Sequence, residues 1–192
     1  MSIFLVLLSL TLWFCNSGKT DQKADEKVAP LTISTTSGAF NESFARLLNN
    51  YFSLRDALVE ADSVKVNASA TTLQLNASNL KLDEIGGDTT GTIRETAKLF
   101  AETISGSANA LAGEDGLEAK RREFNMISDA LWSLTRTVQY DGQKVYYLFC
   151  PMALDNSGGY WLSQTPDIGN PYYGNEMLTC GEVKDSLDYS KR

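Results

Sequence analysis

The sequence predicts a mostly α-helical protein: an antiparallel, up-down four-helix bundle followed by a C-terminal module of irregular structure and short β-strands. Two observations predict this fold class. Apolar residues recur three and four positions apart in four successive segments, as on the buried face of an amphipathic helix. After Tyr140 this period gives way to a strand-like run, Lys144 to Phe149, and then to turns rich in Gly and Asn.

Each predicted helix is defined by its apolar stripe. The stripes are, in order, Phe40, Phe44, Leu47, Tyr51, Leu54, Leu58; Val66, Ala70, Leu73, Ala77, Leu80; Ile93, Ala97, Phe100, Ile104, Ala108, Leu111; and Leu117, Phe124, Ile127, Leu131, Leu134, Val138. Asn41 is the expected N-cap of the first helix. We expect the bundle to span 39–140 and the C-terminal module to span 141–185, packed on the bundle.

The N-terminus has the pattern of an export signal. An uncharged apolar run over 3–14 ends at Cys15 and is too short to cross a bilayer, which takes about 20 residues. It resembles a bacterial lipoprotein signal, with 1–14 as signal peptide, Cys15 as the lipid-bearing residue and 15–38 as a flexible tether. We therefore expect an exported cell-envelope protein, lipid-anchored to the inner or outer membrane. The alternatives are a secretory signal cut elsewhere, or an anchor that is never cut.

Composition excludes several classes of function. The 192 residues include no His, which removes Ser-His-Asp and Cys-His catalysis and His-ligated metal sites. A net charge of −7 argues against binding to nucleic acid. The two cysteines of the folded part lack the Cys-x-x-Cys spacing of thiol–disulfide enzymes. We therefore do not expect an enzyme.

Sulfur residues form the most informative group. Cys150 and Met152 follow the predicted strand, and Met177 and Cys180 lie three positions apart farther on. In an extended segment residues i and i+2 share a side, and a turn brings i and i+3 together, so all four can face one centre. Thiolates and thioethers are soft ligands that select Cu(I), with Ag(I) as its analogue. Met126 is a possible extra donor. The sequence thus suggests a Cu(I)-binding protein.

A disulfide is the alternative interpretation of the same residues. Disulfides form in exported proteins, and lipidation of Cys15 would leave Cys150 and Cys180 as an even pair. The protein would then be a structural or interaction lipoprotein stapled by this bridge. Its partner-binding patch would be aromatic, formed by Trp161, Tyr172 and Tyr173. Residue spacing leaves both interpretations open.

Several stretches of the chain resemble the bacterial domain of unknown function 3347 family. They are Cys150-Pro-Met-Ala, Gly159-Tyr-Trp-Leu-Ser and Asn170-Pro-Tyr-Tyr-Gly-Asn-Glu-Met-Leu-Thr-Cys-Gly181, with Tyr51, Leu54 to Leu58, Arg121-x-x-Phe124 and Ser128 in the bundle. The resemblance covers about 40–183. The Cys-Pro-Met and Met-Leu-x-Cys-Gly motifs are its most specific part.

The resemblance implies a role in handling copper or another heavy metal. Domains of this family occur as exported proteins or lipoproteins, and also attached to periplasmic adaptor subunits of heavy-metal efflux pumps. By position, the four sulfur residues match those of the family. The matched scaffold residues are Trp161, Asn170, Pro171, Tyr172 and Gly174. The hairpin and barrel domains of an adaptor do not occur in this chain, so we expect a stand-alone partner of an efflux system.

Overall fold

A computed structural model describes residues 35–191 of the chain. Its elements are β1 (Thr35–Thr36), α1 (Gly38–Val59), α2 (Ser63–Ser78), η1 (Leu82–Glu84), β2 (Ile85–Gly86), α3 (Thr92–Gly113), α4 (Leu117–Val138), β3 (Val145–Cys150), α5 (Ala153–Asn156), β4 (Gly159–Ser163), η2 (Gly174–Glu176) and β5 (Glu182–Leu187). The mostly helical fold class and the four long helices are thereby confirmed. The predicted Cys15, the signal and most of the tether lie outside the described residues.

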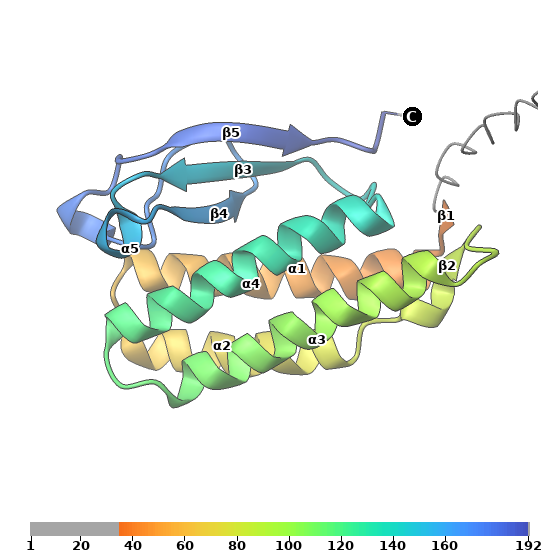
Figure 1. Ribbon diagram of the computed structural model, residues 1–192, viewed down its shortest axis with the longest axis horizontal. Helices are drawn as coiled ribbons and strands as arrows, with labels where there is room; N and C mark the ends of the chain where they lie inside the picture. Colours follow the sequence, from red (N-terminus) through yellow and green to blue (C-terminus); the bar gives the residue numbers. More distant parts are fainter. Residues whose placement is uncertain (1–34, 192) are drawn as a thin grey trace, which may run out of the picture. The chain divides into compact units, whose positions relative to one another are not determined.

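Helices α1 and α4 lie next to the small sheet, and α2 and α3 lie on their other side (Figure 1). Each long helix packs against the next one in the sequence, and β4 packs against both α4 and α1. The sheet is antiparallel in the order β4-β3-β5. A second, two-stranded sheet pairs β1 with β2 and thus gives structure to the last residues of the expected tether.

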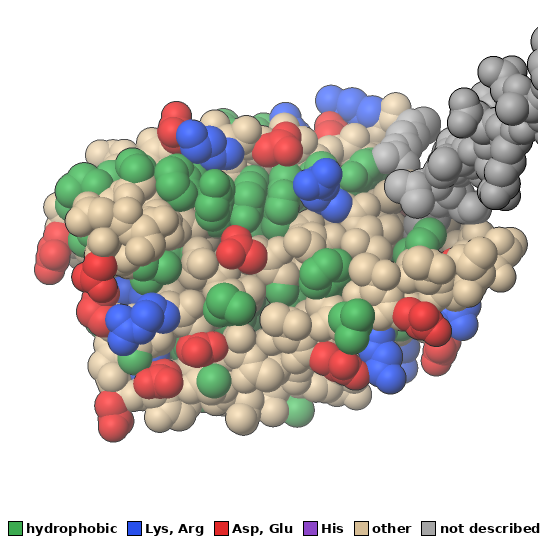
Figure 2. All heavy atoms as spheres, in the orientation of Figure 1, with side chains coloured by type: hydrophobic (Ala, Val, Ile, Leu, Met, Phe, Trp, Pro, Cys, Tyr) green, Lys and Arg blue, Asp and Glu red, His purple; other side chains and the backbone are tan. Residues whose placement is uncertain are grey.

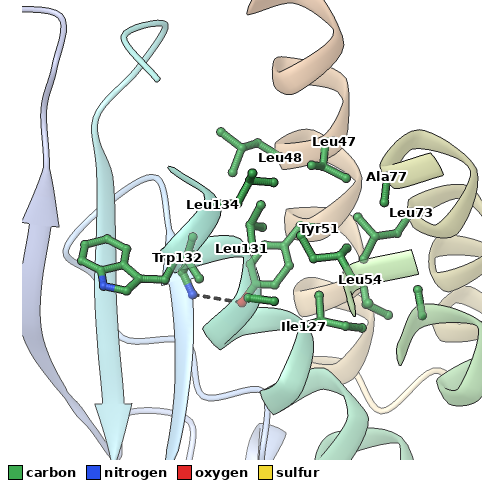
Figure 3. Packing of buried hydrophobic residues seen from close by; sticks show 14 of the residues in the cluster. Leu47, Leu48, Tyr51, Leu54, Leu73, Ala77, Ile127, Leu131, Trp132 and Leu134 are labelled. Carbon is green, nitrogen blue, oxygen red and sulfur yellow. Dashed lines mark hydrogen bonds between the residues drawn. The ribbon is translucent and has the colours of Figure 1, made fainter. Parts of the chain in front are cut away.

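The predicted apolar stripes form the core. Side chains of α1, α2 and α4 point toward one another, among them Leu47, Tyr51, Leu73 and Leu131 (Figure 3). Every residue of the first stripe is completely buried. The residues of the other three stripes are buried as well, with three exceptions. These are Ile93, Phe100 and Leu117, which lie partly buried at the margin of the core. Hydrophobic periodicity therefore located the interior of the bundle.

Some of the helix ends are capped by polar side chains that the apolar pattern does not reveal. The Ser37 hydroxyl accepts a hydrogen bond from the Phe40 amide at 3.1 Å, so Ser37 is the N-cap of α1. The prediction of Asn41 as cap was wrong, because Asn41 lies inside the helix and binds Asp141. At the far end of α3, the buried Lys120 ammonium donates to the carbonyls of Leu111 and Glu114.

Helix α4 has a second buried face, which lies under the sheet. Ser128, Thr135 and Trp132 are almost completely buried there, and the Trp132 ring stacks on Tyr147 with centroids 4.4 Å apart. The Tyr51 hydroxyl of α1 lies 2.7 Å from the Ser128 Oγ and accepts a hydrogen bond from the Leu162 amide at 3.0 Å (Figure 3). This phenol thus joins α1, α4 and β4.

Within residues 35–191, none of the helices combines the length and the hydropathy that a membrane span requires.

Replacing Tyr51 by Phe tests this junction. The ring is retained, but the Leu162 amide and the Ser128 hydroxyl lose a buried partner, which should lower the free energy of unfolding by about 1–3 kcal/mol. Urea denaturation of the variant measures this loss. The control is Tyr146→Phe, for which we expect a change within about 0.5 kcal/mol. Equal stability of Tyr51→Phe and the wild type would contradict the assigned role.

Candidate metal site

The two cysteines of the folded part meet at one end of the sheet. Cys150 is the last residue of β3 and is completely buried, whereas Cys180 precedes β5 and is partly buried. Their sulfur atoms are 3.2 Å apart, and both thiols are free. The structure therefore brings together two residues that lie far apart in the sequence.

Only one of the two methionines lies in the local structure that the spacing predicts. The Cys180 amide donates to the Met177 carbonyl at 3.0 Å, which closes the expected turn. The extended segment expected for Cys150 and Met152 was wrong, because β3 ends at Cys150 and Met152 has helical backbone angles (φ −87°, ψ −12°). Met152 is 43% exposed and Met177 is partly exposed. Each thiol thus has a methionine on the turn beside it.

Other side chains add little to a possible ligand set. Met126, the possible extra donor, is 52% exposed on α4. In the part of the chain that the structure describes, no cluster of three or more His, Cys, Asp or Glu residues could hold a metal ion. A metal bound at this end of the sheet would therefore depend on the two thiols and on thioether sulfur.

Asn170 holds the loop that carries Met177 and Cys180. Its completely buried side chain donates to the Cys180 carbonyl at 2.9 Å and accepts from the Tyr172 amide at 2.8 Å. Its backbone amide donates to the Leu178 carbonyl at 3.0 Å, and its carbonyl accepts from the Gly174 amide at 2.9 Å. One asparagine thus closes both ends of the loop from 170 to 180.

Helix α4 anchors the same loop to the bundle. The Arg121 Nε donates to the Pro171 carbonyl at 3.0 Å. The Asn125 Oδ1 accepts from the Tyr160 amide at 2.9 Å and lies 3.0 Å from the Tyr172 hydroxyl. Sequence reasoning missed Asn125, although Arg121, Asn125 and Ser128 recur at helical spacing on α4. That polar stripe is the signal that could have revealed the second buried face.

Gly174 shows why the loop tolerates little change. Its φ is +55°, and an added Cβ would lie 2.6 Å from the Val59 carbonyl oxygen at the end of α1. A larger residue there would be strained and would also collide with the bundle. Gly159 is similarly restricted, because a Cβ would lie 2.6 Å from the Tyr172 ring.

The backbone beside Cys150 and Met152 is strained. Leu154, Asp155 and Asn156 all have left-handed backbone angles, with φ of 53°, 59° and 65°. This conformation costs roughly 1–2 kcal/mol for each residue with a side chain. The Tyr173 hydroxyl donates to the Met152 carbonyl at 2.6 Å and helps to hold the turn. Such strain is concentrated at functional sites in proteins.

Comparison with known proteins identifies the family. The family model "Protein of unknown function (DUF3347)" matches residues 47–142, half of the chain. The chain belongs to this family. The matched residues run from α1 to the turn before β3, so all four sulfur residues lie beyond them. Comparisons with curated proteins and with solved structures found no match. The family resemblance is confirmed, and the association with efflux adaptors stays a prediction.

The Cys150 thiol of this DUF3347 chain affects the pKa values of two neighbouring groups, Cys180 and Tyr173. The hydrogen-bonding contact with Cys150, followed by burial, raises the pKa of the Cys180 thiol. Burial, followed by the charge of a Cys150 thiolate, raises the pKa of the Tyr173 phenol. A cation bound between the thiols would favour their deprotonated forms.

A row of aromatic rings in contact joins α4 to the sheet of this DUF3347 chain, with the first three rings stacked and the last one tilted. It runs from Trp132 to Tyr147, Tyr160 and Phe149, with successive centroids 4.4, 4.7 and 4.5 Å apart. Figure 2 shows a row of hydrophobic side chains along this side of the molecule. The expected surface patch of Trp161 and Tyr172 was wrong, because both residues are buried.

Replacing Asn170 by Ala tests the loop clamp. The substitution leaves the Tyr172 amide and the Cys180 carbonyl without a partner, and should lower the free energy of unfolding by about 2–4 kcal/mol. Chemical denaturation measures this loss. Asn175→Ala, at an exposed position in the same loop, is the control and should change stability by less than about 0.5 kcal/mol. Similar stabilities of the two variants would refute the role of Asn170.

Proposed function

We propose that this protein is a membrane-tethered, exported lipoprotein that binds a soft metal ion, Cu(I), through Cys150, Met152, Met177 and Cys180. The single observation that carries the proposal is the 3.2 Å separation of two free thiol sulfurs, each beside a turn that carries a methionine. The bound ion would be handed on or sequestered, as part of copper or heavy-metal handling.

The donor set favours a monovalent soft ion over zinc or divalent copper. Thiolate and thioether sulfur suit Cu(I), whereas zinc prefers Cys, His or carboxylate ligands to thioether. The chain has no His, and its net charge of −7 modestly favours the approach of a cation. Cys150 would supply a ligand fixed by the sheet, and Cys180 a ligand fixed by the Asn170 clamp.

The rest of the proposal concerns where this binding takes place. Lipidation at Cys15 would anchor the chain to the inner or outer membrane, and the segment that follows would be its tether. The short links between successive helices favour an antiparallel, up-down bundle, which would serve as a rigid support for the sulfur site. The family resemblance suggests a heavy-metal efflux component as the recipient of the ion.

Titration of Cu(I) into the reduced protein, against a competing chelator, tests the proposed ligands. We expect one ion per chain. Cys150→Ser and Cys180→Ser should each weaken binding by more than about 100-fold, because loss of a direct ligand exceeds the effect of an outer contact. Met152→Leu and Met177→Leu should each weaken it less, by on the order of tenfold, because a neutral thioether is a weaker ligand than a thiolate. Met126→Leu is the matched control and should bind as the wild type does. Failure of the reduced protein to compete with a weak chelator would overturn the proposal.

The second candidate function is that of a structural or interaction lipoprotein with a Cys150–Cys180 disulfide. The same thiol contact favours it, because oxidation of two adjacent thiols needs little movement of the loop. The number of free thiols in protein purified without reductant separates the two functions, because a Cys150–Cys180 bridge removes both of these thiols from the count. A bridge that persists, in a protein that binds no copper after reduction, would favour the structural role.

The proposed binding should depend on pH. Both thiols must lose a proton to become ligands, and the pKa of Cys180 is raised by Cys150 and by burial. Protons therefore compete with the metal throughout the neutral range, and affinity should rise with pH. Between pH 6 and pH 8 we expect a gain of about tenfold to 100-fold per pH unit, for one or two protons released. Chelator competition at several pH values measures this slope, and an affinity independent of pH would contradict thiolate ligation.

A further inference from the structure

Exposed apolar side chains flank the two thiols. Met152 lies two residues after Cys150 and is 43% exposed. Leu178 lies two residues before Cys180 and is 40% exposed. The Tyr173 hydroxyl donates to the Met152 carbonyl at 2.6 Å, which joins the turn after β3 to the loop that ends at Cys180. Apolar side chains that gather at one exposed place are typical of interaction surfaces.

The residues of this place form what we call the site surface, which consists of Met152, Tyr173, Met177 and Leu178. Figure 2 shows hydrophobic side chains, with acidic ones nearby, at the end of the molecule where Figure 1 places α5. The two segments that carry the thiols therefore present one surface to a partner.

Acidic side chains accompany the site surface, and basic ones do not. The segment 145–183 contains four acidic residues and no Lys or Arg. Asp155 comes three residues after Met152, and Glu176 directly precedes Met177. Both carboxylates are exposed, and neither forms an ion pair with another of the residues 35–191. Each methionine thus has an unpaired carboxylate beside it.

Charged groups on the adjoining elements do not cancel this negative charge. Arg121 of α4 pairs with Glu118, and Lys184 of β5 pairs with Glu182, so these pairs add no net charge. Burial and then Cys150 raise the pKa of the Tyr173 phenol, and the charges of Glu118 and Asp155 raise it further. The acidic side chains are therefore near enough to act on a group of the site surface.

We propose that the site surface docks a partner protein whose own sulfur site has an apolar surround and a rim of Lys or Arg. Met152, Tyr173 and Leu178 would exclude water from the contact, and Asp155 and Glu176 would pair with the basic rim. Charges of opposite sign at a rim increase the rate of association and reject partners of the wrong charge.

The docked partner would exchange Cu(I) with this chain. The ion would leave the sulfur ligands of one protein for those of the other and would keep its oxidation state, and the thiols that release it would take up protons again. This step rests on the proposed metal binding, whereas the docking itself can be measured without metal.

Methionine methyl signals in ¹³C NMR spectra of the reduced, metal-free full chain test the docking. The probes are two synthetic peptides, Lys-Met-Lys-Met-Lys and Glu-Met-Glu-Met-Glu, and replacement of each methionine by Leu assigns the signals. The Lys peptide should shift the Met152 and Met177 signals to saturation and bind at least about tenfold more tightly than the Glu peptide. Met126, exposed on α4 outside the site surface, is the control in the same spectrum and should not shift.

Asp155→Asn combined with Glu176→Gln should weaken the Lys peptide by about threefold to tenfold, because two exposed ion pairs are lost. Asp83→Asn combined with Glu84→Gln, at two exposed positions of η1, is the matched control and should not change the affinity.

Four outcomes would overturn the docking proposal. They are no saturable shift at millimolar Lys peptide, equal affinities for the two peptides, a Met126 shift as large as those of the site surface, and equal losses in the two double variants. Failure of the copper titration would instead remove the metal exchange and leave these results unchanged, so the two failures can be told apart.

Discussion

The sulfur site depends on the contact between α4 and the segments that pack over it. Asn125 binds the Tyr160 amide, Arg121 binds the Pro171 carbonyl, and Ser128 binds the Tyr51 phenol. These groups are largely buried, and leaving such a group unpaired is more unfavourable than a formed bond is favourable. The polar face of α4 therefore selects one placement of the sheet and its loops on the bundle.

That placement determines where the thiols lie. Cys150 ends a strand whose inner face belongs to the core, and Cys180 is held by Asn170 in a loop that α4 anchors. The left-handed residues after Met152 lie beside the buried thiol, where the surrounding contacts hold an unfavourable backbone in place. The bundle thus acts as a support that fixes the geometry of the loops.

The apolar stripes were sufficient to predict the four helices, because each helix buries a face against its neighbours. The second buried face of α4 was not predicted, because the apolar pattern does not include Arg121, Asn125 and Ser128, which are polar and are buried by the groups that they bind. Met152 was misplaced because Cys150 ends the strand, which the sequence of that segment does not reveal. The meeting of Cys150 and Cys180 could be anticipated from the turns between them, but the Asn170 clamp requires the folded loop.

The central claim is that sulfur atoms of this module hold Cu(I). X-ray absorption at the copper edge, on the reduced protein loaded with one equivalent of Cu(I), tests it most directly. Soft-ligand chemistry predicts scattering from sulfur neighbours alone, with fewer of them when Met152 and Met177 are replaced by Leu. Nitrogen or oxygen neighbours around the copper, or copper that washes out of the protein, would contradict the claim.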